Sequence, residues 1–491
     1  MRLEELVSRL PGAEISGDPG LEVTSVTHDS RKASEGALFV AIRGLTADGN
    51  RFVDAARAKG AVAVASEGPP AAGVPWIRVG DAREALAVFA AAVLGDPAEA
   101  LTLVGVTGTN GKTTTAGLID AALRASGQKT GLLGTVEYRI ADRPRAAART
   151  TPESSDLQAL FREMADGGCR YSVLEVSSHS LTLKRVHGCR FQVAVFTNLT
   201  RDHLDFHGDM DAYFAAKRVL FDTLLREDGH AVVNVDDDRG PEIVQAARGR
   251  IWTYSLSRPA DLTAEDLVLS LGGTRFRLRS PAGAFELWTP LLGRFNVQNI
   301  LAAFGAALAL GVPAEAALRG VSSFTGVAGR VERVDAGQDF TVIIDYAHTD
   351  DALKNLLETL RELQPRRVVT VFGCGGDRDR TKRPLMGAVA SRLSDVVVLT
   401  SDNPRSEPPE AIIEEIRRGI KPGRDTDVYV IPDRRDAIAK ALEMGREGVA
   451  VVIAGKGHET VQVLRDRTVP FDDRVVVRDI LRRLAVRGGA A

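Results

Sequence analysis

A glycine-rich stretch carries the clearest chemistry of the sequence. It follows a short apolar run, opens a helical pattern, and reads Gly105-Val-Thr-Gly-Thr-Asn-Gly-Lys-Thr-Thr114. Backbone N–H groups in such a turn surround a phosphate, and the following helix adds the positive end of its dipole. We predict that Lys112 reaches the β- and γ-phosphates of a nucleotide and that the Thr113 hydroxyl binds Mg²⁺. The spacing departs from the common phosphate-loop pattern, since Val106 stands where that pattern has glycine.

Two polar residues follow the next strand-like runs along the chain. Glu175 lies near the end of the run 171–176, and His203 follows the run 193–196. Ligands of parallel sheets bind at the carboxyl ends of the strands, so we expect both side chains near the phosphates. A carboxylate oxygen suits Mg²⁺ and an imidazole can complete its shell. Taken singly, each residue is equally compatible with an ordinary surface or core position.

Lys217 occupies an unusual place in a predicted amphipathic helix over 211–225. Its spacing puts it on the apolar face. A lysine turned inward tends to lose its proton, and the neutral amine can then accept CO₂. The resulting carbamate would be an anionic oxygen ligand for Mg²⁺. The alternative is that the lysine stem packs along the apolar face while the ammonium reaches water. The apolar face comprises Tyr213, Phe214, Leu220, Phe221 and Leu224.

A second group of charged residues lies in the last third of the chain. Asp402-Asn-Pro-Arg405 directly follows the apolar run 396–400. The planar fork of Arg405 could grip a carboxylate through two hydrogen bonds, with Arg378 as a second cation. Glu459 could pair with an ammonium group beside the backbone of Gly455. The alternative is that Arg405 is a structural surface residue.

The elements that must position these residues follow an α/β pattern. Short β-branched runs alternate with Ala- and Leu-rich helical stretches, which is typical of α/β domains with largely parallel sheets. The 491 residues exceed the roughly 250–300 that one core supports, so we predict three domains, over 1–98, 99–328 and 329–491. We expect an antiparallel insertion near 274–279. The last domain should hold a sheet covered on both faces, with strands at 341–345, 368–372, 396–400, 428–431 and 449–454.

Composition limits the partners and the compartment. A net charge of -2 gives no basic field for nucleic acid. The three cysteines, Cys169, Cys189 and Cys374, form no close pair, which favours a reducing cytoplasm. The first residues lack the apolar core of a signal peptide, and no apolar run reaches the ~18 residues of a membrane span. We therefore expect a cytoplasmic monomer that acts on small molecules.

The motifs together resemble the Mur ligase family, over essentially the whole chain. The resemblance implies an N-terminal α/β uridine-nucleotide-binding domain, a central P-loop ATPase domain with a parallel sheet, and a C-terminal Rossmann-like α/β domain that binds the amino acid. The matching segments are Gly108–Thr114, Glu175–His179, Thr197–Gly208, Ala215–Lys217, Asn296–Asn299, Asp345–His348, Gly373–Arg378, Asp402–Arg405 and Gly455–Glu459.

The resemblance also implies roles for particular residues. Lys112, Lys217 and His203 would be catalytic, with Lys217 carbamylated. The metal ligands would be Thr113, Glu175, His203 and Lys217. ATP would contact Gly108, Thr109, Asn110, Gly111, Lys112, Thr113, Thr114, Asn299, Arg330 and Asp345. The nucleotide-sugar substrate would contact His28, Ser30, Leu45, Thr46, Ala47, Arg149, Thr150, Thr151, Ser177, Leu183 and Arg185. The amino acid would contact Arg378, Asp402, Asn403, Pro404, Arg405, Gly455 and Glu459.

The activity that the resemblance implies is ATP-dependent ligation of meso-2,6-diaminopimelate to UDP-N-acetylmuramoyl-L-alanyl-D-glutamate through an acyl phosphate, in peptidoglycan precursor synthesis. Mg²⁺ would be the cofactor. The family's diaminopimelate users carry Asp-Asn-Pro-Arg, as at 402–405. The chain departs from the family pattern at Leu45, Thr46, Arg149, Leu183 and Asp350. Alternatives are L-lysine as acceptor, a ligase like folylpolyglutamate synthetase, and a P-loop switch, although no guanine-binding Asn-Lys-x-Asp motif is apparent.

Overall fold

The computed structural model describes residues 1–44, 47–70, 73–421 and 426–488, with the backbone alone for 485–488. Contacts group the chain into two compact units, each described by itself below. The first comprises Met1–Glu265, Leu278–Phe285 and Gln298–Ser323. The second comprises Asp266–Arg277, Glu286–Val297 and Phe324–Ala491. The predicted borders at 98/99 and 328/329 stay predictions.

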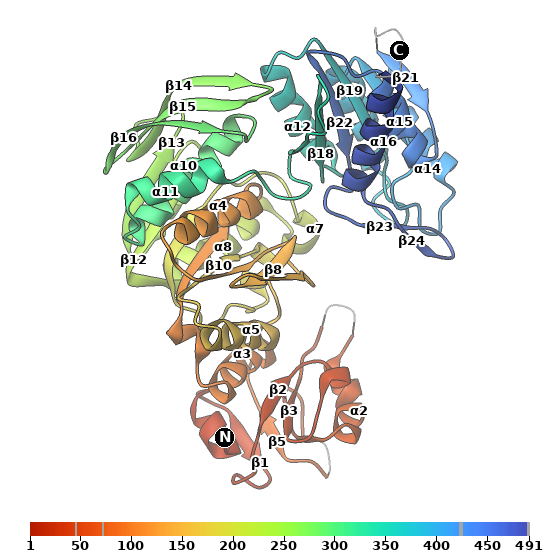
Figure 1. Cartoon of the computed structure of the whole chain (residues 1–491). Coiled ribbons are helices and arrows are strands. Elements are labelled where there is room, and N and C mark those ends of the chain that lie inside the picture. The colour runs from red at the N-terminus through yellow and green to blue at the C-terminus, as the bar shows by residue number, and fades with distance from the viewer. Residues whose placement is uncertain (45–46, 71–72, 422–425, 489–491) are drawn as a thin grey trace. The chain divides into compact units, whose positions relative to one another are not determined.

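The N-terminal part of the first unit is a five-stranded sheet in the order β1-β5-β4-β3-β2 (Figure 1). Alternate residues of β3 enter different cores, since Leu38 and Val40 pack with α3 whereas Phe39 and Ala41 pack with α2. The sheet is therefore covered on both faces. The elements are α1 Leu3–Ser8, β1 Glu14–Ser16, β2 Ser25–Thr27, β3 Ala37–Ala41, α2 Val53–Ala58, β4 Ala61–Ser66, β5 Trp76–Arg78 and α3 Ala82–Val93.

The largest sheet has the strand order β16-β15-β14-β13-β12-β11-β6-β10-β7-β8-β9. Strands β7, β10, β6, β11, β12 and β13 run parallel, so their carboxyl ends share one edge. Its strands are β6 Thr102–Thr107, β7 Thr130–Leu133, β8 Glu137–Ile140, β9 Arg143–Ala146, β10 Tyr171–Glu175, β11 Phe191–Phe196, β12 Leu225–Asn234, β13 Arg250–Ser255, β14 Leu262–Ser270, β15 Gly273–Ser280 and β16 Gly283–Thr289. The two-residue connections of β14, β15 and β16 require antiparallel pairing, as predicted near 274–279.

The helices that accompany this sheet position the predicted site residues. They are α4 Lys112–Ala125, α5 Ser154–Asp166, α6 Ser178–Thr182, α7 Leu204–His207, α8 Met210–Val219, α9 Gly240–Ala246, α10 Arg294–Ala309 and α11 Ala314–Ser323. The predicted helix over 211–225 is confirmed to within one residue at each end, although its last turn is π-helical. After α8 the chain forms a π-helical turn, Leu220–Leu224, and Leu225 already begins β12.

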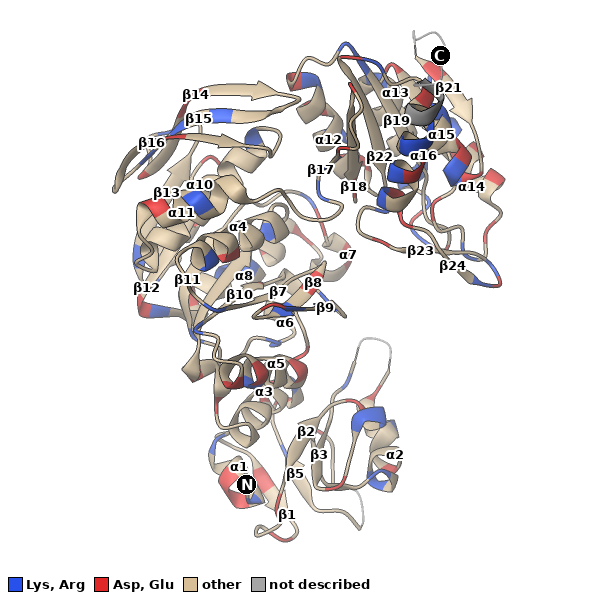
Figure 2. Ribbon diagram, viewed as in Figure 1, with Lys and Arg blue, Asp and Glu red and all other residues tan. Residues whose placement is uncertain are grey.

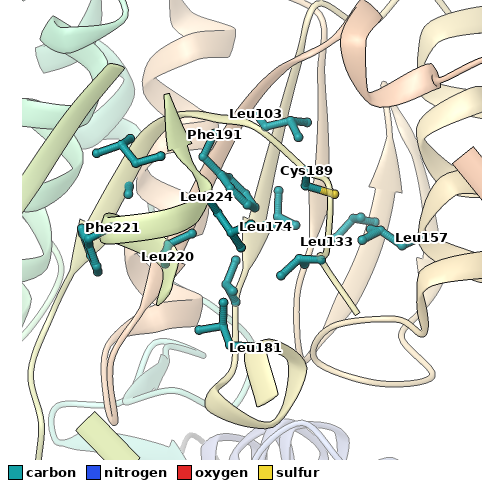
Figure 3. Packing of buried hydrophobic residues seen from close by; sticks show 14 of the residues in the cluster. Leu103, Leu133, Leu157, Leu174, Leu181, Cys189, Phe191, Leu220, Phe221 and Leu224 are labelled. Atoms are coloured by element: carbon teal, nitrogen blue, oxygen red, sulfur yellow. The ribbon is translucent and has the colours of Figure 1, made fainter. Parts of the chain in front are cut away.

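The core beneath the phosphate loop depends on a glycine in β6. A Cβ added at Gly105 would lie 2.9 Å from the ring of Phe191. The glycine therefore gives Phe191 room to pack against the strand. Figure 3 shows Phe191 among Leu103, Leu174, Leu220 and other members of this apolar cluster. Because β6, β10 and β11 are neighbours in the sheet, this packing fixes the strands that end at the predicted site.

The second unit contains a six-stranded sheet in the order β17-β18-β22-β19-β20-β21. Apolar clusters cover both faces, one with α12, α13 and α14 and the other with α15 and α16. The elements are β17 Glu332–Val334, β18 Thr341–Asp345, α12 Asp350–Glu362, β19 Arg367–Phe372, α13 Lys382–Leu393, β20 Val396–Leu399, α14 Pro409–Arg417, β21 Asp427–Val430, α15 Arg434–Glu443, β22 Val449–Ala454, β23 Val461–Val463, β24 Thr468–Pro470 and α16 Asp473–Gly488.

One strand of this sheet contradicts the prediction of burial on both faces. All four residues of β21 are exposed, with Val430 at 48%. The strand lies at the end of the sheet order, so it has one neighbour, β20. An apolar run therefore did not distinguish an edge strand from a buried one.

Both signs of charge occur in each unit (Figure 2). In the part of the chain that the structure describes, no helix has the length and apolarity to cross a membrane.

Candidate active site

The phosphate loop connects β6 to α4, as predicted. Gly108 has φ +148° and Gly111 has φ +85°, which are conformations that residues with a side chain rarely adopt. A Cβ at Gly108 would also overlap the Thr197 hydroxyl. Thr109 donates its backbone N–H to the carbonyl of Asn198 at 2.8 Å, which ties the loop to the end of β11. The loop therefore needs glycine at 108 and 111, and its helix begins at Lys112.

Lys112 and Thr113 lie at the start of α4 and point to different partners. The Lys112 ammonium donates to the carbonyls of Gly108 and Thr109 at 2.9 and 2.8 Å. The Thr113 hydroxyl donates to Glu175 Oε2 at 3.0 Å. Glu175 is buried at the end of β10 and also accepts the backbone N–H of Thr135 at 2.7 Å. The structure thus brings the predicted Thr113 and Glu175 into direct contact.

Lys217 is the most deeply buried cation of this site, with 1% of its surface exposed. Its Nζ donates to the Gly108 carbonyl at 2.8 Å and lies 4.5 Å from the centre of the Tyr213 ring. Burial, reinforced by the charge of Lys112, lowers the pKa of Lys217 well below its ordinary value. The predicted inward orientation of this amine is confirmed. The alternative, in which the ammonium reaches water, is wrong.

His203 belongs to a group of aromatic side chains that the sequence analysis did not assign. It precedes α7 with φ +53°, and its ring meets that of His179 edge-on at 4.7 Å. His179 in turn stacks on Phe206 at 4.2 Å. Burial, and then the charges of His203 and His207, lower the pKa of His179 to about 4. His179 and His207 both lie in motifs that the sequence analysis names, Glu175–His179 and Thr197–Gly208. These motifs could therefore have indicated that both histidines lie near His203.

The donors here fit a hard divalent cation in their chemistry. The Thr113 hydroxyl and the Glu175 carboxylate are oxygen donors in mutual contact, which is what Mg²⁺ prefers. Among the described residues, no group of three His, Cys, Asp or Glu side chains could hold a metal ion. The predicted ligands are one carboxylate, one imidazole, one hydroxyl and one amine. Only two of these four are His, Cys, Asp or Glu, so the predicted set could not form such a group of three. The metal ligands stay predictions.

The predicted muramoyl-peptide contacts gather next to Glu175. The Thr151 hydroxyl donates to the Glu175 carbonyl at 2.8 Å and accepts the Ser177 N–H at 3.2 Å. Arg185 is buried, donates to the Thr151 carbonyl at 3.2 Å and pairs with Glu153 at 2.8 Å. Glu153 is a residue that the sequence analysis missed, and it anchors this arginine. Thr150 joins the group through the Thr135 hydroxyl at 3.1 Å.

The other predicted contacts of this substrate are more scattered. His28 Nδ1 lies 3.2 Å from the Ser155 hydroxyl, and Ser30 begins a short 3₁₀ turn. Ala47 is exposed and its carbonyl accepts the N–H of Gly44. Arg149 is exposed, and Leu183 directly follows α6. Leu45 and Thr46 lie outside the described residues.

Three of the predicted ATP contacts lie beyond the phosphate loop. Asn299, on α10, accepts a hydrogen bond from the Thr115 hydroxyl at 3.1 Å. In the second unit, Asp345 ends β18 and accepts the backbone N–H groups of Val331 and Ala347, each at 2.7 Å. Burial raises the pKa of Asp345. The Arg330 guanidinium lies over the Tyr346 ring at 5.0 Å.

The predicted amino-acid contacts lie in loops at the carboxyl ends of β19, β20 and β22. Arg405 adopts φ +52°, and its Nη1 donates to the Gly376 carbonyl at 2.8 Å. Asn403 donates to Glu459 Oε2 at 2.8 Å. The Lys456 ammonium, which was not predicted, donates to that same Glu459 oxygen at 3.0 Å and to Asn403 Oδ1 at 3.1 Å. These contacts bring the segments 402–405 and 455–459 together.

Asp402 and its neighbours complete this group. Burial raises the pKa of Asp402, and its Oδ2 has no hydrogen-bond partner within the described chain. A Cβ at Gly455 would lie 2.7 Å from that oxygen, so the glycine allows the close approach of the two segments. Pro404 is buried, whereas the Arg378 side chain is exposed and donates to the carbonyl of Asp377.

Comparison with known proteins identifies relatives along nearly the whole chain. Three family descriptions match: "Mur ligase family, catalytic domain" at 22–93, "Mur ligase middle domain" at 106–307, and "Mur ligase, glutamate ligase domain" at 329–457. A UDP-N-acetylmuramoyl-L-alanyl-D-glutamate--2,6-diaminopimelate ligase of Solibacter usitatus is 50% identical over 490 residues, which cover 98% of each chain.

Solved structures agree with this similarity. A structure of a UDP-N-acetylmuramoyl-L-alanyl-D-glutamate--2,6-diaminopimelate ligase is 36% identical, covers 99% of both chains and has a TM-score of 0.74. A folylpolyglutamate synthase of Mycobacterium tuberculosis shares the fold, with a TM-score of 0.61 at 21% identity over 80% of this chain and 93% of that one.

Proposed function

This chain belongs to the Mur ligase family, and from that premise we propose that it ligates meso-2,6-diaminopimelate to UDP-N-acetylmuramoyl-L-alanyl-D-glutamate, with ATP converted to ADP and phosphate. The Solibacter usitatus relative and the solved structure that is 36% identical are both named as ligases of this substrate and 2,6-diaminopimelate. The observation that carries the reaction class is the buried Lys217 amine, which donates to the same Gly108 carbonyl as Lys112 in a phosphate loop.

The chemistry requires activation of a carboxylate, because its oxygen is a poor leaving group. The γ-phosphoryl group of ATP passes to the D-glutamyl carboxylate, which gives an acyl phosphate and ADP. The amine of the acceptor then attacks the acyl carbon, and phosphate leaves from the tetrahedral intermediate as the amide forms. Lys112 and the N–H groups of the loop hold the phosphates and balance the charge that develops on them.

Mg²⁺ supplies charge neutralisation on the phosphates when it is bound. We propose that Thr113, Glu175, His203 and carbamylated Lys217 hold it. The lowered pKa of Lys217 supports this role, because a neutral amine is the form that adds CO₂. Asn299, Arg330 and Asp345 remain the proposed contacts of the nucleotide, and Thr150, Thr151, Ser177 and Arg185 those of the muramoyl peptide.

The acceptor site supports a substrate with a carboxylate at its distal end. Diaminopimelate differs from lysine by that carboxylate, and Arg405 presents a guanidinium on a loop held against the segment 375–378. We propose that Arg405 and Arg378 bind this group, and that Glu459 and the backbone of Gly455 receive the distal ammonium. We also propose that the protein acts as a monomer in the cytoplasm, in keeping with its three unpaired cysteines.

An acceptor-dependent assay tests the proposal. ADP release is measured with ATP, Mg²⁺ and UDP-N-acetylmuramoyl-L-alanyl-D-glutamate, and with diaminopimelate, lysine or ornithine in parallel. We expect turnover with diaminopimelate and little with the other two. Higher turnover with lysine would show that lysine is the acceptor instead. ADP release that needs no amino acid would exclude a ligase.

A further inference from the structure

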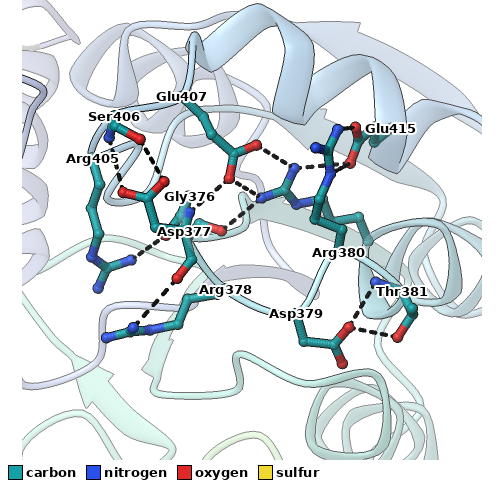
Figure 4. A network of polar contacts seen from close by, with 12 residues as sticks. Gly376, Asp377, Arg378, Asp379, Arg380, Thr381, Arg405, Ser406, Glu407 and Glu415 are labelled. Carbon is teal, nitrogen blue, oxygen red and sulfur yellow. Dashed lines mark hydrogen bonds and ion pairs between the residues drawn. The ribbon is translucent and has the colours of Figure 1, made fainter.

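A fully buried arginine lies beside the two loops that carry Arg378 and Arg405. Arg383, on α13, has 0% of its surface exposed. Its Nη1 donates to Glu407 Oε2 and to Glu415 Oε2, each at 2.8 Å. Its Nη2 donates to Glu407 Oε1 at 2.8 Å and to the Gly375 carbonyl at 3.2 Å. Figure 4 shows this network, in which Glu407 faces the segment 375–378.

Glu407 joins the two loops directly. Besides the two bonds from Arg383, its Oε1 accepts the backbone N–H of Asp377 at 2.7 Å. Ser406 adds a return connection, because Asp377 accepts the Ser406 hydroxyl at 2.6 Å and its N–H at 3.2 Å. The Gly376 N–H also donates to the Asn403 carbonyl at 2.9 Å. Hydrogen bonds thus connect the segments 375–378 and 402–407 on both sides of Arg405.

The packing leaves these loops little freedom to shift. A Cβ added at Gly376 would overlap the Pro404 carbonyl, and one at Gly375 would lie 2.9 Å from Arg405 Nη1. The hydrogen bonds from Arg383 lower the pKa of Glu407 to about 2, so the pair stays ionised at neutral pH. A buried guanidinium also needs its carboxylates, since an uncompensated buried charge is costly. Movement of the loop that carries Glu407 would therefore break this ion pair and leave the buried Arg383 guanidinium without that carboxylate.

We propose that Glu407, held by Arg383, is a positioning residue that fixes the spacing of Arg378 and Arg405, and so selects acceptors that carry a distal carboxylate. The proposal rests on the proposed function. Glu407 acts through the backbone of Asp377 on one loop and through its own loop on the other. The two guanidinium groups can then meet one carboxylate without first ordering their loops, which lowers the cost of binding.

The matched pair Glu407→Gln and Glu415→Gln tests this role. Both changes remove one carboxylate charge from Arg383. In the part of the chain that the structure describes, Glu407 also bonds to Asp377 in the segment 375–378, whereas Glu415 bonds to Arg380 outside that segment. We expect Glu407→Gln to raise the KM for diaminopimelate by roughly 10- to 100-fold, with kcat and the KM for ATP changed much less. The ratio of kcat/KM for diaminopimelate to that for lysine should fall in parallel. Glu415→Gln should change the KM for diaminopimelate by less than about threefold.

An unchanged KM in Glu407→Gln, or an equal rise in Glu415→Gln, would overturn the proposal. Thermal unfolding shows whether each variant is folded. If Glu407→Gln is not, Ser406→Ala decides: it removes one bond to Asp377, and a smaller rise in the KM for diaminopimelate is expected, whereas no rise overturns the idea. Failure of the proposed function would appear differently, as absence of diaminopimelate-dependent ADP release in the unaltered protein.

Discussion

At the scale of single residues, the site depends on charges placed where water does not reach. Within the described residues, Lys217 has one hydrogen bond, to the Gly108 carbonyl, and the Tyr213 ring beside it, which cannot replace the hydration of an ammonium. Its pKa falls as a result, and the amine becomes a nucleophile toward CO₂. The burial that makes the residue reactive also makes it unfavourable for folding, so activity and stability oppose each other at this position.

The change Lys217→Met separates the two effects. Ligation should be lost, because the proposed metal ligand is gone. The free energy of unfolding at neutral pH should rise, because the unfolded wild type binds a proton that the folded protein does not. Stability therefore increases with pH in the wild type, and the advantage of the variant should shrink toward the ordinary pKa of lysine. Urea unfolding in bicarbonate-free buffer at several pH values measures this, and full ligation by the variant would contradict the carbamate.

Arg405→Ala should act mainly on the acceptor. Loss of a charged hydrogen-bond partner should weaken diaminopimelate binding by about 2–5 kcal/mol, which appears as a higher KM. Steady-state kinetics with each substrate varied in turn measure it. Arg465→Ala, at an exposed position in the turn between β23 and β24, is the control and should leave the KM unchanged. Equal effects on the KM for ATP and for diaminopimelate would argue against a specific contact.

At the scale of elements, glycines decide how closely loops approach one another. Gly108 and Gly111 let the phosphate loop turn over the end of β11, and Gly375 and Gly376 let the segment after β19 lie against 402–405. The first pair is needed for positive φ as well as for space. Gly376 is needed for space, because an added methyl group would meet the carbonyl of Pro404.

Gly376→Ala should therefore separate the two acceptor loops. We expect a higher KM for diaminopimelate and a melting temperature lower by a few degrees, since overpacking costs about 1–3 kcal/mol. Gly127→Ala is a useful comparison, because Gly127 has φ +82° but nothing within 4 Å of its added Cβ. It should lower the melting temperature through backbone strain without altering the KM. An unchanged KM in Gly376→Ala would show that the loops can give way.

At the scale of the whole molecule, each unit has its own buried core and its own buried ion pairs. In the second unit, Arg434 and Asp473 are both completely buried and joined at 2.7 and 2.8 Å. Arg434 also donates to the Ala454 carbonyl at 3.1 Å, at the end of β22. This pair ties α15 and α16 to the sheet edge that carries the acceptor loops.

Arg434→Met should destabilise the second unit selectively. It leaves the buried Asp473 carboxylate without its partner, which costs about 3–5 kcal/mol. Scanning calorimetry should show one transition moved to lower temperature and the other in place, because units with separate cores can unfold separately. Arg435→Met is the matched control, since Arg435 pairs with Asp479 in a partly exposed position and should contribute about 0–1 kcal/mol. A common shift of both transitions would indicate a single cooperative unit.

The sequence by itself determined the α/β class, the strand–loop–helix of the phosphate site and the inward amine at 217. These features follow from the spacing of apolar, polar and glycine residues within one segment, which does not depend on where that segment lies in the fold. Only the tertiary structure decided that Glu407 and Arg383 link the acceptor loops, that His179 packs between His203 and Phe206, and that β21 is an exposed edge. The apolar run 428–431 was misinterpreted as a strand buried on both faces, and the pattern over 211–225 did not show that the last helical turn is π-helical. Partners distant in sequence determine which surfaces are covered and where a helix ends, and no local pattern records them.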